Sequence, residues 1–154
     1  MILAATGHRP DKLGGYTPEA AMRLRALALA CMYEHRPTWV ISGMAQGWDW
    51  AVAIAAVEMR IPFTAAIPFW GQESRWPEKT QRNYVRLLGM AKSVHVESTT
   101  DLNEWFAYQG RNVWMVDKCD LLLALWDGSK GGTANCVRYA REVDRPICNV
   151  WESF

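Results

Sequence analysis

The chain has 154 residues, of which half are hydrophobic and 21% are charged, and its formal net charge is +1 at pH 7. This composition is typical of one globular domain with a buried core, and it excludes an intrinsically disordered chain. The near-neutral charge provides no overall basic field for nucleic acid. Nucleic-acid binding would therefore need a local patch, and it is not the favoured function.

Nothing in the sequence indicates export or insertion into a membrane. The apolar start is interrupted at 7–9, unlike a signal peptide. The apolar helix expected around 20–33 contains Arg23 and Arg25 and is too short to span a bilayer. The four cysteines lie far apart without a Cys-x-x-Cys pair, so we expect reduced thiols and no metal site. We therefore expect a cytoplasmic protein with no membrane partner.

Short apolar runs alternate with segments of helical spacing along the whole chain. Thr17 followed by Pro18 is a helix start, and glycine or proline separates most other segments. We expect strands at 1–5, 38–42, 63–67, 93–97, 120–126 and 146–151. Between them we expect helices at 17–35, 47–60, 77–90 and 102–116, and a last helix that ends near Val143. Thr100 or Asp101 is expected to cap the helix at 102–116. This alternation predicts one α/β domain over 1–154, with a mostly parallel sheet of about six strands and helices on both faces.

Two glycine-containing turns each join a predicted strand to a predicted helix. The first, 42–49, contains Gly43, Met44, Ala45, Gly47 and Asp49; the second, 127–133, contains Asp127, Gly128, Gly131, Gly132 and Thr133. Small residues let backbone N–H groups and the positive end of a helix dipole reach an anion. Ordinary strand-to-helix turns are the alternative, and the presence of two such turns favours a phosphate or ribose site.

Two further loops, 6–10 and 68–76, also follow predicted strands. Ligands of open parallel sheets bind beyond the carboxyl ends of the strands, so we expect one cleft there. The ligand-binding candidates in these loops are Thr6, Gly7, His8, Arg9 and Trp70. Arg9 offers a bidentate fork for phosphate. A base could stack on one of the tryptophans near the expected cleft, although each of them has a core or interface role as its alternative; they are Trp48, Trp70, Trp76 and Trp126.

The segment 42–49 resembles the Ser-Gly-x-Ala-x-Gly-x-Asp motif of the SLOG superfamily, and 127–133 resembles its second glycine motif. The segment 6–10 and the pair Arg111-Asn112 resemble the YpsA-like branch. The resemblance implies a Rossmann-like domain that binds a nucleotide or a nucleotide-derived molecule as a sensor or sequestering protein. It adds Arg111 and Asn112 to the ligand-binding candidates, implies no required cofactor, and implies a homo-oligomer.

Two alternatives stay open. The superfamily includes the Lonely Guy phosphoribohydrolases, whose second motif ends in a catalytic glutamate, and Cys136 stands at that position here. Hydrolysis or transfer at an N-glycosidic bond would then rest on Asp49 or Glu73, both weak catalytic candidates with binding or structural alternatives. The superfamily also includes DNA-processing protein A, so binding of single-stranded DNA is the second alternative.

Overall fold

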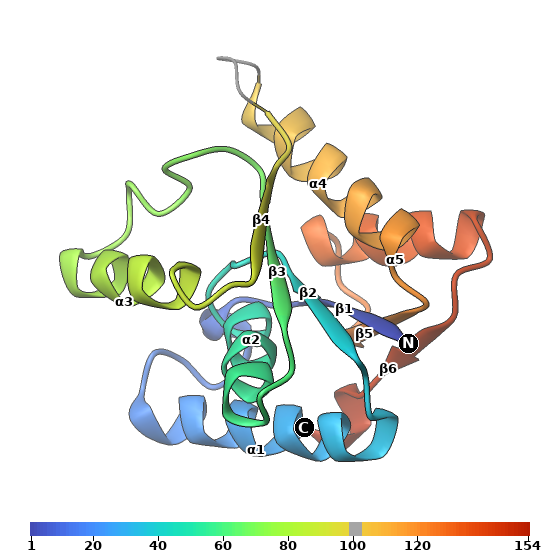
Figure 1. Ribbon diagram of the computed structural model, residues 1–154, viewed down its shortest axis with the longest axis horizontal. Helices are drawn as coiled ribbons and strands as arrows, with labels where there is room; N and C mark the ends of the chain where they lie inside the picture. The colour runs from blue at the N-terminus through green and yellow to red at the C-terminus, as the bar shows by residue number, and fades with distance from the viewer. Residues whose placement is uncertain (99–102) are drawn as a thin grey trace.

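The computed structural model describes residues 1–98 and 103–154, which form one parallel sheet of six strands alternating with helices (Figure 1). The strands are β1 (Ile2–Gly7), β2 (Trp39–Ser42), β3 (Phe63–Ile67), β4 (Ser93–Val96), β5 (Leu121–Leu125) and β6 (Ile147–Asn149). The helices are α1 (Pro18–His35), α2 (Trp48–Glu58), α3 (Glu78–Leu88), α4 (Glu104–Lys118) and α5 (Gly132–Glu142), with short 3-10 turns η1 (Pro10–Lys12) and η2 (Trp151–Ser153). The predicted α/β class is confirmed.

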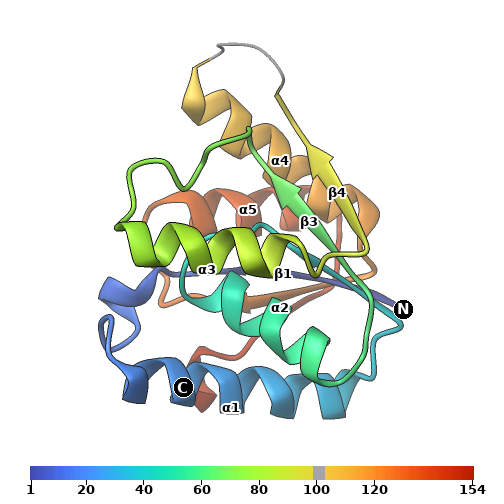
Figure 2. The ribbon, with the colours of Figure 1, turned by 60° about the vertical axis from the view of Figure 1, so that its left-hand side comes forward.

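Helices cover both faces of the sheet (Figure 2). α1, α2 and α3 pack on one face, and α4 and α5 pack on the other. β1 shows why both faces must be apolar, because Leu3 and Ala5 lie in the first core while Ala4 between them lies in the second. The result is the three-layer sandwich expected from the alternating pattern.

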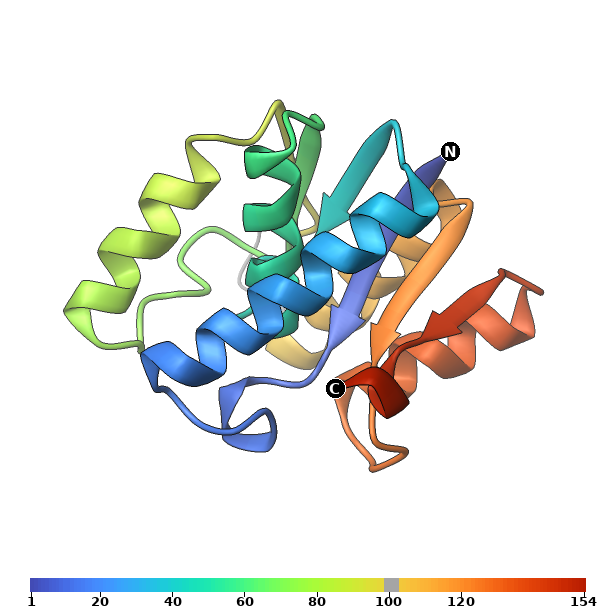
Figure 3. The ribbon, with the colours of Figure 1, turned by 90° about the horizontal axis from the view of Figure 1, so that it is seen from below.

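The strand order is β4-β3-β2-β1-β5-β6, so the order along the chain reverses beside β1. The loops that follow β1 and β5 leave the sheet at the same edge (Figure 3). One continues into α1 on one face, and the other continues into α5 on the opposite face. This divergence leaves a crevice at the carboxyl ends of the two strands, which is where open α/β sheets bind ligands.

Most helix and strand boundaries predicted from the sequence lie within a few residues of those in the structure, and the differences have local causes. β1 continues two residues past its predicted end because its pairing with β5 extends to Gly7 and Leu125. The last strand is shorter than predicted because the chain turns into η2 after Val150. The predicted cap of α1 is confirmed, since the Thr17 side chain accepts a hydrogen bond from the Ala20 N–H at 3.2 Å.

α4 begins two residues later than predicted, at Glu104. The Asn103 side chain caps it by accepting a hydrogen bond from the Trp105 N–H at 2.9 Å. The predicted capping residues, Thr100 and Asp101, lie outside the described residues. Among the helices that the structure describes, none is both long enough and apolar enough to cross a membrane. All four cysteines are free.

Gly7 and Trp48 pack against each other where β1 ends. Trp48 is fully buried, and its indole N–H donates a hydrogen bond to the Leu123 carbonyl at 3.3 Å. A Cβ atom on Gly7 would lie 2.5 Å from the Trp48 Cβ, which is closer than such atoms approach. Trp48 is thus a core residue that holds α2 against β1 and β5, and it does not flank the cleft as its sequence position suggested.

Replacing Gly7 with alanine is expected to lower the free energy of unfolding by about 1–3 kcal/mol, the usual cost of forcing a methyl group into a packed site. Urea unfolding followed by circular dichroism measures this loss. Gly132→Ala is the control, since a Cβ there meets nothing within 4 Å and should change stability by about 0.5 kcal/mol or less. Equal stabilities of the two variants would contradict the packing described.

Candidate functional site

A cleft of about 500 Å³ opens where the strand order reverses. Its walls come from the loop after β1, the turn between β2 and α2, one face of α4, and the start of α5. Most of the residues expected to bind a ligand line it: Thr6, Gly7, His8, Arg9, Ala45, Asp49, Arg111, Asn112, Gly131, Gly132 and Thr133. Three of the four loops expected to converge, 6–10, 42–49 and 127–133, contribute to this cleft, and the loop 68–76 does not.

The turn between β5 and α5 supplies the part of the cleft best suited to an anion. α5 begins at Gly132 with no side-chain cap and no acidic residue in its first turn. Gly131 has φ +142, a conformation that side-chain-bearing residues rarely adopt, and a Cβ at either glycine would meet open space. The first N–H groups of a helix lack intrahelical partners, so the positive end of α5 lies bare in the cleft.

The loop after β1 adds positive charge opposite this turn. Among the described residues, the exposed Arg9 side chain has no hydrogen-bond or salt-bridge partner. The Lys12 ammonium group donates to the Ser129 hydroxyl at 2.6 Å and so joins the two loops. The charged residues that line the cleft are Arg9, Lys12, Arg111, Lys130, Asp11 and Asp49. Cations outnumber carboxylates, which favours an anionic ligand.

His8 is held at the base of this region by Asp127. The His8 Nε2 lies 2.7 Å from the Asp127 Oδ1. The Ser129 hydroxyl and backbone N–H also donate to this carboxylate, and together with His8 they hold the pKa of Asp127 below its usual range. Asp127 itself does not line the cleft; its side chain orients His8, which does.

Arg111 and Asp49 form a buried charged floor, with exposed fractions of 6% and 5%. The Arg111 Nη1 donates to the Gly43 carbonyl at 2.5 Å and to the Ala66 carbonyl at 3.2 Å. Burial lowers the pKa of Arg111, and the Asp49 charge opposes this. Burial raises the pKa of Asp49 to about 6, against the opposing effects of Arg111 and of the Ala45 N–H. Asp49 is therefore a carboxyl group able to change its charge near neutral pH.

Contrary to expectation, Gly43, Met44 and Gly47 of the first glycine turn do not line the cleft. Met44 is fully buried in the core with φ +62. The space beside Gly43 is occupied by the side chains of Arg111 and Asp49. Gly47 packs against the His8 carbonyl, 2.5 Å from where its Cβ would be. Gly128 of the second turn also lies outside the lining.

The loop 68–76 does not reach the cleft, so Trp70 and Glu73 stand apart from the other candidates. It follows β3, which is two strands from β1, a separation of roughly 10 Å at ordinary strand spacing. The loop swings outward toward α3 (Figure 1). Trp70 is exposed to solvent, and Glu73 acts electrostatically on Tyr84 of α3. Of the two weak catalytic candidates, only Asp49 lines the cleft.

The aromatic residues of the cleft are not those singled out from the sequence. Trp76 packs against Trp50 and Tyr84, and the Trp126 indole donates to the Ser129 carbonyl at 2.8 Å. The lining residues that the sequence reasoning did not name include Trp105, Tyr108 and Gln109, all on α4. Their helical spacing from the candidate Asn112 was the available signal.

Cys136, which stands where the related hydrolases have a glutamate, has no access to a ligand. It is fully buried, and burial raises the pKa of its thiol to about 12, despite a hydrogen bond with Thr6. A buried thiol of this kind does not shuttle protons at neutral pH. Within residues 1–98 and 103–154, no group of three or more His, Cys, Asp or Glu side chains is placed to hold a metal ion.

Comparisons with known proteins cover most of the chain. A model described as the YspA SLOG family matches residues 3–143. A UPF0398 protein of Bacillus pumilus is 29% identical over 142 residues, which are 86% of this chain and 76% of that protein. The uncharacterised SPbeta prophage-derived protein YoqJ of Bacillus subtilis is 31% identical over 120 residues, 66% of this chain and 68% of that protein.

Two solved structures of DNA processing protein A share the fold. The protein from Streptococcus pneumoniae superposes with a TM-score of 0.66 at 19% identity, over 94% of this chain and 48% of that one. The protein from Helicobacter pylori, described by its single-stranded DNA binding mode, superposes with a TM-score of 0.68 at 17% identity, over 96% and 63%. The chain thus spans only about half to two thirds of these proteins, and the likeness establishes the fold alone.

The raised pKa of Asp49 makes stability depend on pH. Because the folded state binds this proton with a pKa of about 6 against the ordinary 3.8, the contribution of Asp49 is greatest below the ordinary value and is lost as pH rises toward 6. Asp49→Asn removes the titration. We expect its free energy of unfolding, relative to wild type, to rise by about 2 kcal/mol between about pH 4 and pH 7 in urea titrations.

The matched control is Asp11→Asn, which alters an exposed carboxylate of the same cleft. Its stability relative to wild type should stay nearly constant over this range. A difference between Asp49→Asn and wild type that does not change with pH would show that Asp49 ionises normally in the folded protein.

Proposed function

The chain belongs to the YspA SLOG family, and from that premise we propose that its cleft binds a phosphorylated nucleotide or a nucleotide-derived molecule, as a sensor or a sequestering protein. The observation that carries the proposal is the uncapped start of α5, where Gly131 and Gly132 lie in the cleft with Arg9 and Lys130. Phosphate binds such a helix start through backbone N–H groups. Arg9 has the free guanidinium fork that suits a second pair of phosphate oxygens.

The size of the cleft favours a small ligand over a polymer. Its volume of about 500 Å³ falls within the roughly 300–1,000 Å³ of small-molecule sites. Single-stranded DNA is the competing ligand, because one structural neighbour is described by that activity. The two are separated by salt dependence, since release of counterions makes DNA affinity fall steeply between low and moderate salt.

A second candidate function is hydrolysis of an N-glycosidic bond, and one observation favours it. Asp49 lines the cleft and has a pKa of about 6, which suits a group that gives or takes a proton near neutral pH. The reaction would add water to AMP and release adenine and ribose 5-phosphate. Mass spectrometry of AMP incubated with wild type and with Asp49→Asn tests it; intact AMP in both samples would leave binding as the function.

The first experiment is calorimetry of the protein with AMP, adenosine and ribose 5-phosphate, supported by a thermal-shift screen of other nucleotides. A ligand that binds only the folded state raises its stability by mass action. Binding of AMP without cleavage supports the proposal. If no phosphorylated nucleotide binds, the proposal is wrong, and oligonucleotides at several salt concentrations become the next ligands to test.

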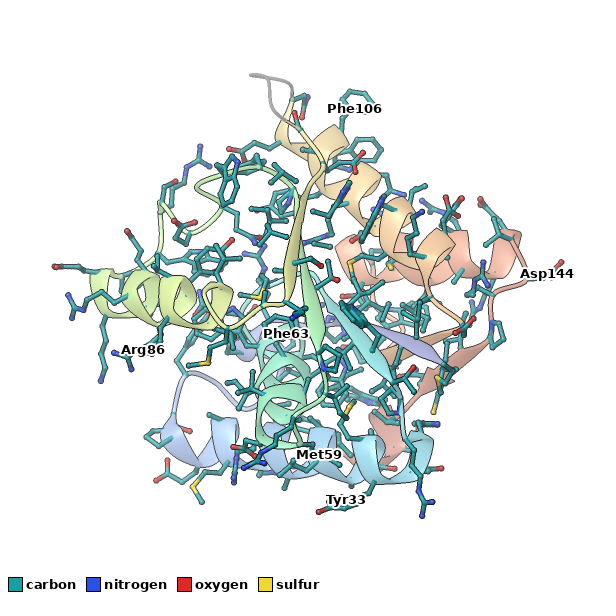
Figure 4. The ribbon with its side chains drawn as sticks, in the orientation of Figure 1. Tyr33, Met59, Phe63, Arg86, Phe106 and Asp144 are labelled. Atoms are coloured by element: carbon teal, nitrogen blue, oxygen red, sulfur yellow. The ribbon has the colours of Figure 1, made fainter. Side chains whose placement is uncertain are left out.

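Arg9→Ala should weaken AMP binding roughly 10–100-fold, the usual worth of a charge-assisted hydrogen bond, while adenosine affinity stays nearly constant. The reason is that Arg9 would contact the phosphate, which adenosine lacks. Calorimetric titration of both compounds gives the comparison. Arg86→Ala is the control, because this arginine points outward from α3, away from the cleft (Figure 4). Equal losses for AMP and adenosine would argue against a phosphate contact.

Gly132→Asp should abolish AMP binding while the domain stays folded. The change puts a side chain and a negative charge into the anion-binding turn, yet an aspartate in the first turn of a helix is favourable for the helix itself. Gly132→Asn separates the two causes, because it adds nearly the same volume without the charge, and it should lose less affinity. Wild-type affinity in the aspartate variant, with folding verified by circular dichroism, would exclude this turn as the phosphate site.

A further inference from the structure

One face of α4 lines the cleft, and its side chains change from aromatic to polar along the helix. Trp105, Tyr108, Asn112 and Met115 follow one another at helical spacing, and all four line the cleft. The aromatic pair stands at the start of the helix. Asn112 stands two turns later, where its side-chain N–H donates to the Gly132 carbonyl at 3.4 Å. The same helix face therefore connects an aromatic end of the cleft to the start of α5.

The rise of α4 gives the distance between the aromatic end of the cleft and the start of α5. With a rise of about 1.5 Å per residue, Tyr108 lies roughly 6 Å, and Trp105 roughly 10 Å, along the helix axis from Asn112. A ligand held at the start of α5 by an anionic group would thus meet the aromatic rings one to two helical turns away. In a nucleotide, the ribose separates the phosphate from the planar base over a span of that order.

The two rings differ in how firmly they are held. The Tyr108 ring packs edge-on against Phe69 with centroids 5.6 Å apart, and the Arg111 guanidinium lies 5.5 Å from its centroid. Trp105 keeps 55% of its surface exposed, although its ring packs edge-on against the neighbouring Phe106 with centroids 5.1 Å apart and its backbone N–H is capped by Asn103. A tryptophan face left open to solvent beside a cationic cleft is the surface on which a planar base stacks.

We propose that the base of the bound nucleotide stacks on Trp105, with the ribose passing Tyr108 and the phosphate at the start of α5. This inference rests on the proposed function and goes further, because it assigns a direction to the ligand along the cleft. It also identifies the ligand class as one that carries both an anionic group and a planar ring. A sugar phosphate alone would occupy the anionic end and leave Trp105 uncovered.

The test compares AMP with ribose 5-phosphate by calorimetry on wild type, Trp105→Ala and Trp105→Phe. Trp105→Ala should weaken AMP about tenfold, the usual loss when a stacking ring is removed, and leave ribose 5-phosphate unchanged. Trp105→Phe should keep most of the AMP affinity because it keeps a ring. Tyr33→Ala is the control, since Tyr33 is an exposed aromatic residue on the outer side of α1 that does not line the cleft (Figure 4).

The outcomes separate this inference from the function on which it rests. Wild type that binds AMP no more tightly than ribose 5-phosphate, or an equal loss for both compounds in Trp105→Ala, overturns the stacking and leaves a phosphate-binding cleft. Wild type that binds neither compound overturns the proposed function, and the inference falls with it. Loss of AMP affinity in Tyr33→Ala equal to that in Trp105→Ala would also overturn it, because the effect would not be specific to the cleft.

Discussion

The buried guanidinium of Arg111 fixes the position of α4 over the sheet, and the shape of the cleft depends on it. Its hydrogen bonds reach carbonyl groups at the ends of two adjacent strands, from Gly43 after β2 and from Ala66 in β3. Carbonyls satisfy its N–H groups but do not neutralise its charge, and Asp49 supplies the opposing charge. Removing Arg111 would leave the Asp49 charge buried without an opposing charge at neutral pH, and breaking a buried pair in this way typically costs about 3–5 kcal/mol.

The same contact explains why glycine stands at position 43. A Cβ there would lie 2.7 Å from both the Arg111 Nη1 and the Asp49 Oδ2, so only glycine leaves room for the two charges. The two glycine turns of the chain therefore have different structural roles. The turn after β2 builds the charged floor, whereas the turn after β5 leaves the start of α5 open to a ligand. A shared motif of small residues does not imply a shared role.

Features that depend on local sequence could be predicted, and features that depend on strand order could not. The alternation of elements, the Thr17 cap and the cleft residues next to strand ends, such as Arg9 and Gly132, follow from local pattern. The exclusion of Trp70 depends on β3 lying two strands from β1, which no local pattern reveals. The role of Trp105 depends on how α4 crosses the sheet, and the burial of Trp48 depends on the absence of a Cβ at Gly7.

The cleft forms only after β1 and β5 have paired, because its walls follow these two strands. The Ile2 N–H bonds to the Asp120 carboxylate, 118 positions further along the chain, so the two walls come from opposite ends of the sequence. Closing so long a loop costs conformational entropy, and pairings between distant strands generally slow folding. A chain still on the ribosome holds its first strand without the partner that completes the site until β5 emerges. A chain that ends before β5 would therefore lack one wall of the cleft.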